Sequence, residues 1–90
     1  MSLKIAIFDD NNNIRDSISL LIGTAPGLRV VGSFPNVLNC IQNIGQCNPD
    51  IILMDIEMPK MSGIEAVKLI KKEYPQIQYP LANNFLAKGS

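Results

Sequence analysis

The chain contains no histidine, which excludes histidine-based acid–base and triad chemistry and removes a common zinc ligand. It has only two cysteines, Cys40 and Cys47, in a segment with a helical pattern. Seven residues of helix between them place the two thiols about 10 Å apart along the axis, beyond the reach of a disulfide. We therefore expect reduced thiols in a cytoplasmic protein.

Charge and long hydrophobic runs are also scarce. The chain has 8 basic and 8 acidic residues, so its net charge is zero, and charged residues make up only 18% of it. A neutral chain does not attract DNA, RNA or an anionic membrane, so we expect neither a nucleic acid nor a membrane as partner. No apolar run approaches the length of a membrane span, and the N-terminus lacks the pattern of a signal peptide. The 90 residues, 47% hydrophobic, predict one small globular domain.

Two apolar runs each end in carboxylates. Ile51–Met54 is followed by Asp55, and Leu3–Phe8 is followed by Asp9 and Asp10. Consecutive apolar residues without alternation predict strands covered on both faces, as in a parallel sheet between helices. For the first of these runs a buried helical turn is the alternative, but turn-forming residues on both sides leave too few residues for a helix.

Three further segments show helical spacing, and Leu28–Phe34, which contains a glycine and a charge, is typical of an edge strand. The first predicted helix follows the asparagines at 11–13, the second begins at 35–36 and ends at Gly45, and the third runs from a capping box at 62–65 to 74–75. Their apolar faces are predicted to contain Ile14, Ile18, Leu21 and Ile22; Val37, Leu38, Ile41 and Ile44; and Ile64, Val67 and Ile70. Three lysines of the third helix, Lys68, Lys71 and Lys72, are expected to face solvent.

Alternating strands and helices predict an α/β fold with right-handed parallel crossovers. If the first and third strands are neighbours, about 4.8 Å apart, Asp9, Asp10 and Asp55 converge at one edge of the sheet. When carboxylates are crowded, either the pKa of one of them rises or the group binds a cation. Oxygen ligands favour a hard ion, and the small number of protein ligands favours Mg²⁺ over Ca²⁺. The turn after the first strand lacks the glycine-rich phosphate loop of a nucleotide-binding sheet.

The chain resembles the receiver domain of two-component response regulators. The matching residues are the Asp9-Asp10 pair, Asp55, the dipeptide at 58–59 (Met-Pro) and Gly63, within a resemblance that covers about residues 3–75. The resemblance implies a flavodoxin-like three-layer sandwich around a parallel sheet, with the first strand between the second and third.

The resemblance also implies a function. Asp55 would be the phosphoacceptor of a phosphorelay, taking a phosphoryl group from a histidine kinase, a phosphotransfer protein or a small acyl phosphate. Asp10 and Asp55 would bind Mg²⁺ together with the backbone carbonyl of Glu57, and Asp9 would act through water. The domain would be a signalling module rather than an enzyme, capable at most of Mg²⁺-dependent self-phosphorylation. A haloacid-dehalogenase-like phosphatase would need a second aspartate where Glu57 stands.

The chain is shorter than a complete receiver, which has five strands. It has room for three strand–helix units over residues 1–75 and a tail over 76–90, in which Lys88 resembles the site lysine of the fifth strand. The fourth strand, with its serine or threonine, has no match. Either an internal deletion joined the third helix to the fifth strand, or the tail is unrelated sequence. The alternative function is therefore a truncated or engineered remnant that folds and self-associates without productive phosphorylation.

Three strands in the implied order leave the third strand, Ile51–Met54, at an edge of the sheet. An apolar edge with open backbone groups needs a partner. Residues 85–88 could fold back as a fourth strand, but Pro80 and the short connection disfavour this. We therefore expect a homodimer that forms through the open edge.

Overall fold

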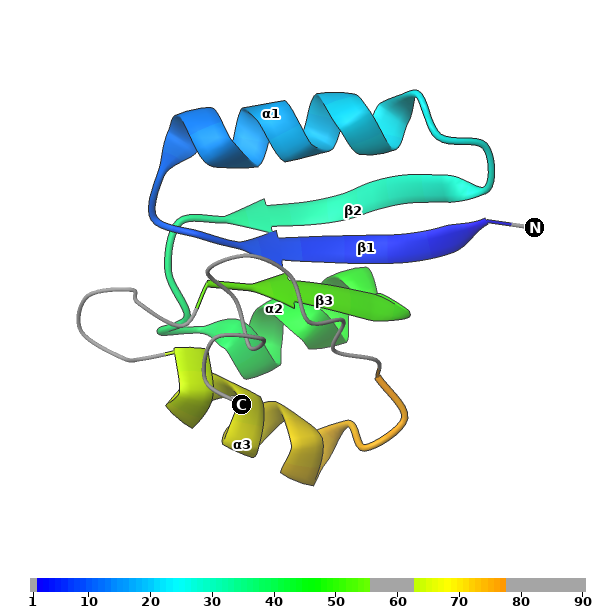
Figure 1. Ribbon diagram of the computed structural model, residues 1–90. Coiled ribbons are helices and arrows are strands. Elements are labelled where there is room, and N and C mark those ends of the chain that lie inside the picture. Colours follow the sequence, from blue (N-terminus) through cyan, green and yellow to red (C-terminus); the bar gives the residue numbers. More distant parts are fainter. Residues whose placement is uncertain (1, 56–62, 78–90) are drawn as a thin grey trace.

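The computed structural model describes residues 2–55 and 63–77 of the chain (Figure 1). Strands and helices alternate in these ranges, as the sequence predicts. The elements are β1 (Leu3–Phe8), α1 (Asn12–Gly23), β2 (Leu28–Phe34), α2 (Cys40–Cys47), β3 (Ile51–Met54) and α3 (Gly63–Glu73). No helix in these ranges combines the length and the apolarity needed to cross a membrane.

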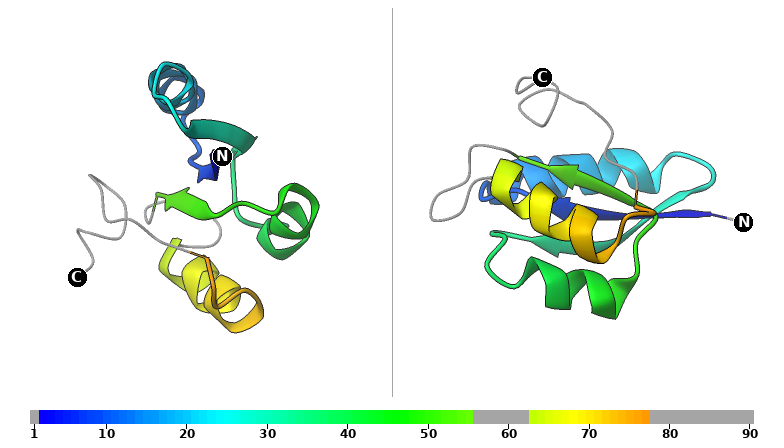
Figure 2. Two further views of the ribbon diagram at one scale, coloured as in Figure 1. Left: turned by 90° about the vertical axis from the view of Figure 1, so that its right-hand side faces the viewer. Right: turned by 90° about the horizontal axis from the view of Figure 1, so that it is seen from below.

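The strands form a parallel sheet of three strands in the order β2-β1-β3, which confirms the predicted α/β topology. Helix α1 covers one face of the sheet, and α2 and α3 cover the other (Figure 2). This three-layer arrangement follows from right-handed crossovers, because the chain reverses its direction across the sheet after β2, when it passes back over β1 to reach β3.

The core has two parts that lie on opposite faces of β1. Ile5 and Ile7 pack with Ile22 of α1 in the smaller cluster, whereas Ala6 and Phe8 belong to the larger cluster under α2 and α3. Successive side chains of a strand point to opposite faces, so a strand covered on both sides needs apolar residues at every position. Other members of the larger cluster are Val37, Cys40, Ile44, Ile52, Met54, Ala66, Val67, Ile70 and Ile77.

Strand β3 is covered less evenly than β1. Ile52 and Met54 are each 1% exposed in the larger cluster, whereas Ile51 and Leu53 are only partly buried against the smaller one. Within the residues that the structure describes, the α1 side of β3 is therefore the less protected side of the sheet.

Three predicted core positions are wrong, one in α1, one in α3 and one, Leu38, just before α2. Leu21 of α1 is 71% exposed, while its neighbour Ile22 is buried. Ile64 of α3 is 43% exposed. Adjacent helical residues lie about 100° apart around the axis, and a helix on a flat sheet buries a narrow stripe, so hydrophobic spacing alone overestimates the apolar face.

Helix α2 also begins later than predicted. It runs from Cys40 instead of from residue 35 or 36, and it continues past the predicted end at Gly45 to a left-handed C-cap at Asn48, where φ is 50°. The side chain of Asn36 accepts a hydrogen bond from the backbone N–H of Leu38 at 3.1 Å. Such local bonds compete with helix formation, and Leu38, predicted to be in the core, is 49% exposed.

Both cysteines are free, as predicted. Cys40 is buried and Cys47 is partly buried, and burial raises the pKa of both thiols. A raised pKa lowers the fraction of reactive thiolate, so both side chains act as small apolar core residues.

A bulge in β2 brings the two aromatic residues of the sheet together. The register between β1 and β2 shifts after Ile5, so that Ala6 pairs with Gly32. The ring of Phe34 then folds back over Gly32 and stacks on Phe8, with ring centroids 5.0 Å apart. A Cβ atom at position 32 would lie 2.6 Å from the Phe34 ring, so this packing requires glycine.

We expect Gly32→Ala to destabilise the protein by about 1–3 kcal/mol, because the Phe34 ring must leave its place on Phe8. Urea denaturation measures the change in the free energy of unfolding. Gly23→Ala is the matched control, since a Cβ at the end of α1 meets no atom within 4 Å. That control should be neutral or stabilising by up to about 1 kcal/mol. Equal effects of the two substitutions would contradict the packing role of Gly32.

Candidate functional site

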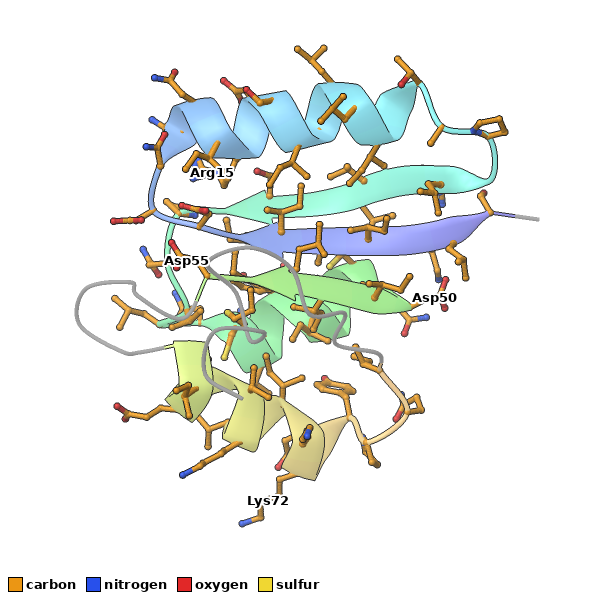
Figure 3. All side chains as sticks on the ribbon, viewed as in Figure 1. Arg15, Asp50, Asp55 and Lys72 are labelled. Atoms are coloured by element: carbon orange, nitrogen blue, oxygen red, sulfur yellow. The ribbon has the colours of Figure 1, made fainter. Side chains whose placement is uncertain are left out.

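The C-terminal ends of β1 and β3 carry two buried carboxylates. The backbone N–H of Asp55 donates to the carbonyl of Phe8 at 3.0 Å, and the N–H of Asp9 donates to the carbonyl of Phe34 at 3.1 Å. Parallel pairing therefore continues one residue beyond each strand. Asp9 and Asp55 are fixed by the same hydrogen bonds that hold the sheet together, and Figure 3 shows Asp55 at the end of β3.

Asp9, Asp10 and Asp55 come together at this edge of the sheet. One carboxylate oxygen from each lies within 4.8 Å of the others. Asp9 is 3% exposed and Asp55 is 9% exposed, whereas Asp10 faces solvent. The structure thus brings together the three carboxylates that the sequence predicts to converge, with two of them buried and the third at the mouth of the site.

The turn between β1 and α1 holds Asp9 by its side chain as well. Its Oδ1 accepts a hydrogen bond from the backbone N–H of Asn11 at 2.9 Å. The side chain of Asn11 in turn caps α1 by accepting from the backbone N–H of Ile14 at 3.1 Å. Asn11 therefore orders the turn and orients the Asp9 carboxylate, whereas Asn12 and Asn13 of the predicted cap cluster are the first residues of α1.

Burial raises the pKa of the Asp9 carboxyl above its ordinary value of 3.8. The hydrogen bond from Asn11 opposes this shift, while the charges of Asp55 and Asp10 add to it. A cation between the oxygens would replace this repulsion with attraction. Oxygen-only donors of this charge and spacing are the donor set that hard divalent cations take in proteins, so the residues fit such an ion.

Several residues in the predicted site lie outside the part of the chain that the structure describes. These are Glu57, the dipeptide at 58–59, the capping serine Ser62, and Lys88. Gly63 is described and begins α3. The geometry above therefore concerns the acidic half of the predicted site.

Arg15 contacts the acidic turn and is not among the residues predicted from the sequence. Its Nη1 donates to the backbone carbonyl of Asp9 at 2.9 Å, and its Nε donates to Oγ of Ser33 in β2 at 3.1 Å. The only available signal is position: Arg15 lies in the first turn of α1, one helical turn after the Asn11 cap. Figure 3 shows Arg15 and Asp55 at the same end of the sheet.

A separate apolar cavity of about 350 Å³ lies between the start of α2 and α3. It shares no lining residue with the acidic cluster, and neither a carboxylate nor an amine lines it. The lining residues are Val37, Leu38, Asn39, Cys40, Ile41, Gln42 and Leu69. Its chemistry gives no reason to connect it with the carboxylates.

Comparison with known proteins gives one consistent family. The family model of the response regulator receiver domain matches residues 5–81. The response regulator protein VraR of Staphylococcus epidermidis is 35% identical over 86 residues, which cover 96% of this chain and 41% of that protein. A protein-glutamate methylesterase/protein-glutamine glutaminase of Pyrococcus horikoshii is 33% identical over 73 residues, 81% of this chain and 20% of that protein. The chain thus spans less than half the length of these curated relatives.

Solved structures show the same fold. The response regulator domain of Thermotoga maritima CheB superposes with a TM-score of 0.79 and 36% sequence identity, covering 84% of this chain and 57% of that one. The isolated REC domain of Salmonella enterica RcsB superposes with a TM-score of 0.80 at 23% identity, covering 88% and 59%; this likeness supports the fold alone. The predicted flavodoxin-like fold is confirmed, and the described sheet is an incomplete version of it.

In the absence of divalent cations, we expect Asp9→Asn to raise the free energy of unfolding at pH 7. The amide keeps an acceptor for the Asn11 N–H but removes the buried charge. Well below pH 3.8 the carboxyl is protonated in both the folded and the unfolded protein, so its ionisation has no cost there. As the pH rises, the unfolded chain releases the proton first, and the wild type loses stability through the raised pKa of Asp9.

Urea denaturation in EDTA across a pH series measures this effect. The gain in stability of Asp9→Asn over wild type should grow as the pH rises from about 3.8 and then level off. A difference that stays constant over the series would contradict the ionisation cost assigned to Asp9.

Proposed function

The chain belongs to the response regulator receiver domain family, and from this premise we propose that it is a phosphoacceptor domain whose Asp55 receives a phosphoryl group in an Mg²⁺-dependent reaction. The single observation that carries the proposal is the acidic cluster, in which oxygens of Asp9, Asp10 and Asp55 lie within 4.8 Å of one another. Receiver domains of two-component systems are signalling modules rather than enzymes, and the proposed reaction is a single transfer.

In this proposal Asp55 is the nucleophile. One of its oxygens forms a new P–O bond while the bond from phosphorus to the donor breaks, and the electron pair of that bond leaves with the donor. The donor is a phosphohistidine of a histidine kinase or phosphotransfer protein, or a small acyl phosphate. The low exposure of Asp55, 9%, limits access of water to the resulting acyl phosphate.

The neighbouring groups would bind the metal and the transferred group. Asp10, Asp55 and the backbone carbonyl of Glu57 would hold Mg²⁺, with Asp9 acting through water. When bound, Mg²⁺ offsets the repulsion between the carboxylates and the phosphoryl oxygens. The raised pKa of Asp9 supports this assignment, because it arises first from burial of the carboxylate and then from the nearby charges of Asp55 and Asp10. Lys88 would pair with the transferred phosphoryl group.

A second candidate function is a receiver remnant that self-associates without productive phosphorylation. The observation that favours it is the position of β3, which among the described residues pairs with β1 alone. Its side chains Ile51 and Leu53 are only partly buried on the α1 side. An open apolar edge of this kind favours pairing with another strand, so we propose a homodimer that forms along β3.

The division into a receiver-like portion at residues 1–75 and a tail at 76–90 stays a prediction. Ile77 is 5% exposed and packs in the larger core, so the start of the predicted tail takes part in the fold.

Incubation with acetyl phosphate and Mg²⁺ tests the phosphoacceptor role. We expect the intact mass to increase by one phosphoryl group in the wild type and to stay unchanged in Asp55→Asn, which lacks the nucleophilic oxygen. EDTA should prevent the gain. A wild type that gains no mass while Mg²⁺ still binds would favour the remnant function.

Sedimentation velocity over a concentration series tests the homodimer. We expect the weight-average sedimentation coefficient to rise with concentration toward the value of a dimer, because pairing along β3 is a bimolecular step. A monomer that persists at high micromolar concentration would show that the edge of β3 is closed within one chain.

A further inference from the structure

We propose that Arg15 is a positioning residue for the acidic cluster: it holds the backbone of Asp9 at the point where β1 leaves the sheet. The inference depends on the proposed function, because the cluster must bind a cation for its positioning to matter. It goes beyond the predicted site, in which the metal ligands come from strand ends alone.

The guanidinium group of Arg15 bridges the elements that meet behind the cluster. Nη1 donates to the carbonyl of Asp9 at 2.9 Å, Nε donates to Oγ of Ser33 at 3.1 Å, and Nη2 donates to Oδ1 of Asn12. Three separate N–H groups therefore link the end of β1, strand β2 and the first turn of α1. Because Arg15 is itself part of α1, the contact fixes the helix start to the sheet.

The Asp9 carbonyl needs this donor because the strand ladder stops beside it. The N–H of Asp9 still donates to Phe34, the last residue of β2. In a continued parallel ladder the carbonyl of Asp9 would accept from an N–H further along β2. The paired register ends at Phe8 and Phe34, and the guanidinium takes the place of the missing backbone donor.

The position of Asp10 follows from its two anchored neighbours. Asp9 is held by Phe34 and Arg15, and Asn11 is held by the Asp9 carboxylate and by its own role as cap of α1. Loosening the Asp9 carbonyl would therefore move both carboxylates of the pair relative to Asp55, whose backbone N–H is held by the carbonyl of Phe8.

The positively charged guanidinium group of Arg15 can lie beside the acidic cluster without occupying the place of a bound metal ion. All three acceptors of Arg15 are neutral oxygens: a carbonyl, a hydroxyl and a side-chain amide. Arg15 thus leaves the carboxylate oxygens of Asp9 to the N–H of Asn11 and to a water on the bound ion. Lysine carries its donors on one nitrogen and cannot reproduce the planar fork that reaches three acceptors.

The test is an Mg²⁺ titration of the full chain, followed by amide chemical shifts, on the wild type, Arg15→Lys and Ser33→Ala. Loss of a group that orients metal ligands weakens affinity about 10- to 100-fold, so we expect at least a tenfold weaker Mg²⁺ affinity in Arg15→Lys. Ser33→Ala removes one acceptor and should weaken it about threefold. Ile44→Val, a small truncation in the core under α2, controls for general destabilisation and should leave the affinity unchanged.

Amide hydrogen exchange without metal supplies the second readout. We expect Arg15→Lys to increase exchange at Asp9 and Asn11 severalfold over the wild type, with no such local change in Ile44→Val. Unchanged exchange at these amides, or equal Mg²⁺ affinity in Arg15→Lys and wild type, overturns the inference. A wild type that shows no shift near Asp10 or Asp55 at millimolar Mg²⁺ overturns the proposed function instead, and the exchange result then decides the role of Arg15 in the turn. If Arg15→Lys fails to fold, the same two readouts on Ser33→Ala decide it.

Discussion

The parallel pairing of β1 with β3 is the constraint on which the site depends. Asp9 and Asp55 are far apart in sequence, and they meet because each follows a strand whose last residue is hydrogen bonded in register with its neighbour. The ladder extends one residue past each strand and places both carboxylates at the same edge. A shift of this register by one residue would turn Asp55 to the opposite face of the sheet and dissolve the cluster.

The acidic cluster places three carboxylates close together at the C-terminal edge of the sheet. Asp9 is nearly inaccessible to solvent and has a raised pKa, so in the absence of a cation its charge opposes folding. Hydrophobic burial next to the site offsets this cost. Phe8 and Met54, the strand residues just before the two buried carboxylates, are fully buried in the larger core. Packing under α2 and α3 therefore supports a site that electrostatics alone would push apart.

The two faces of the sheet are protected unequally. The larger core joins β1, β3, α2 and α3, whereas the smaller one, within residues 2–55 and 63–77, joins the sheet to α1 alone. Among the described residues, Ile51 and Leu53 are the β3 side chains on the weaker side. Asp55 directly follows β3, which among the described residues pairs with β1 alone, so the acidic site adjoins the strand along which we propose the homodimer.

The sequence by itself determined the element order, the strands β1 and β3 and the convergence of Asp9, Asp10 and Asp55, because continuous apolar runs that end in carboxylates carry these features locally. Spacing alone could not place Leu21, whose burial depends on the angle at which α1 meets the sheet. Nor could it find Arg15, whose acceptors on Asp9 and Ser33 become neighbours only when β2 and β1 pair. Tertiary structure decided these contacts because each joins residues that the chain brings together only through sheet register.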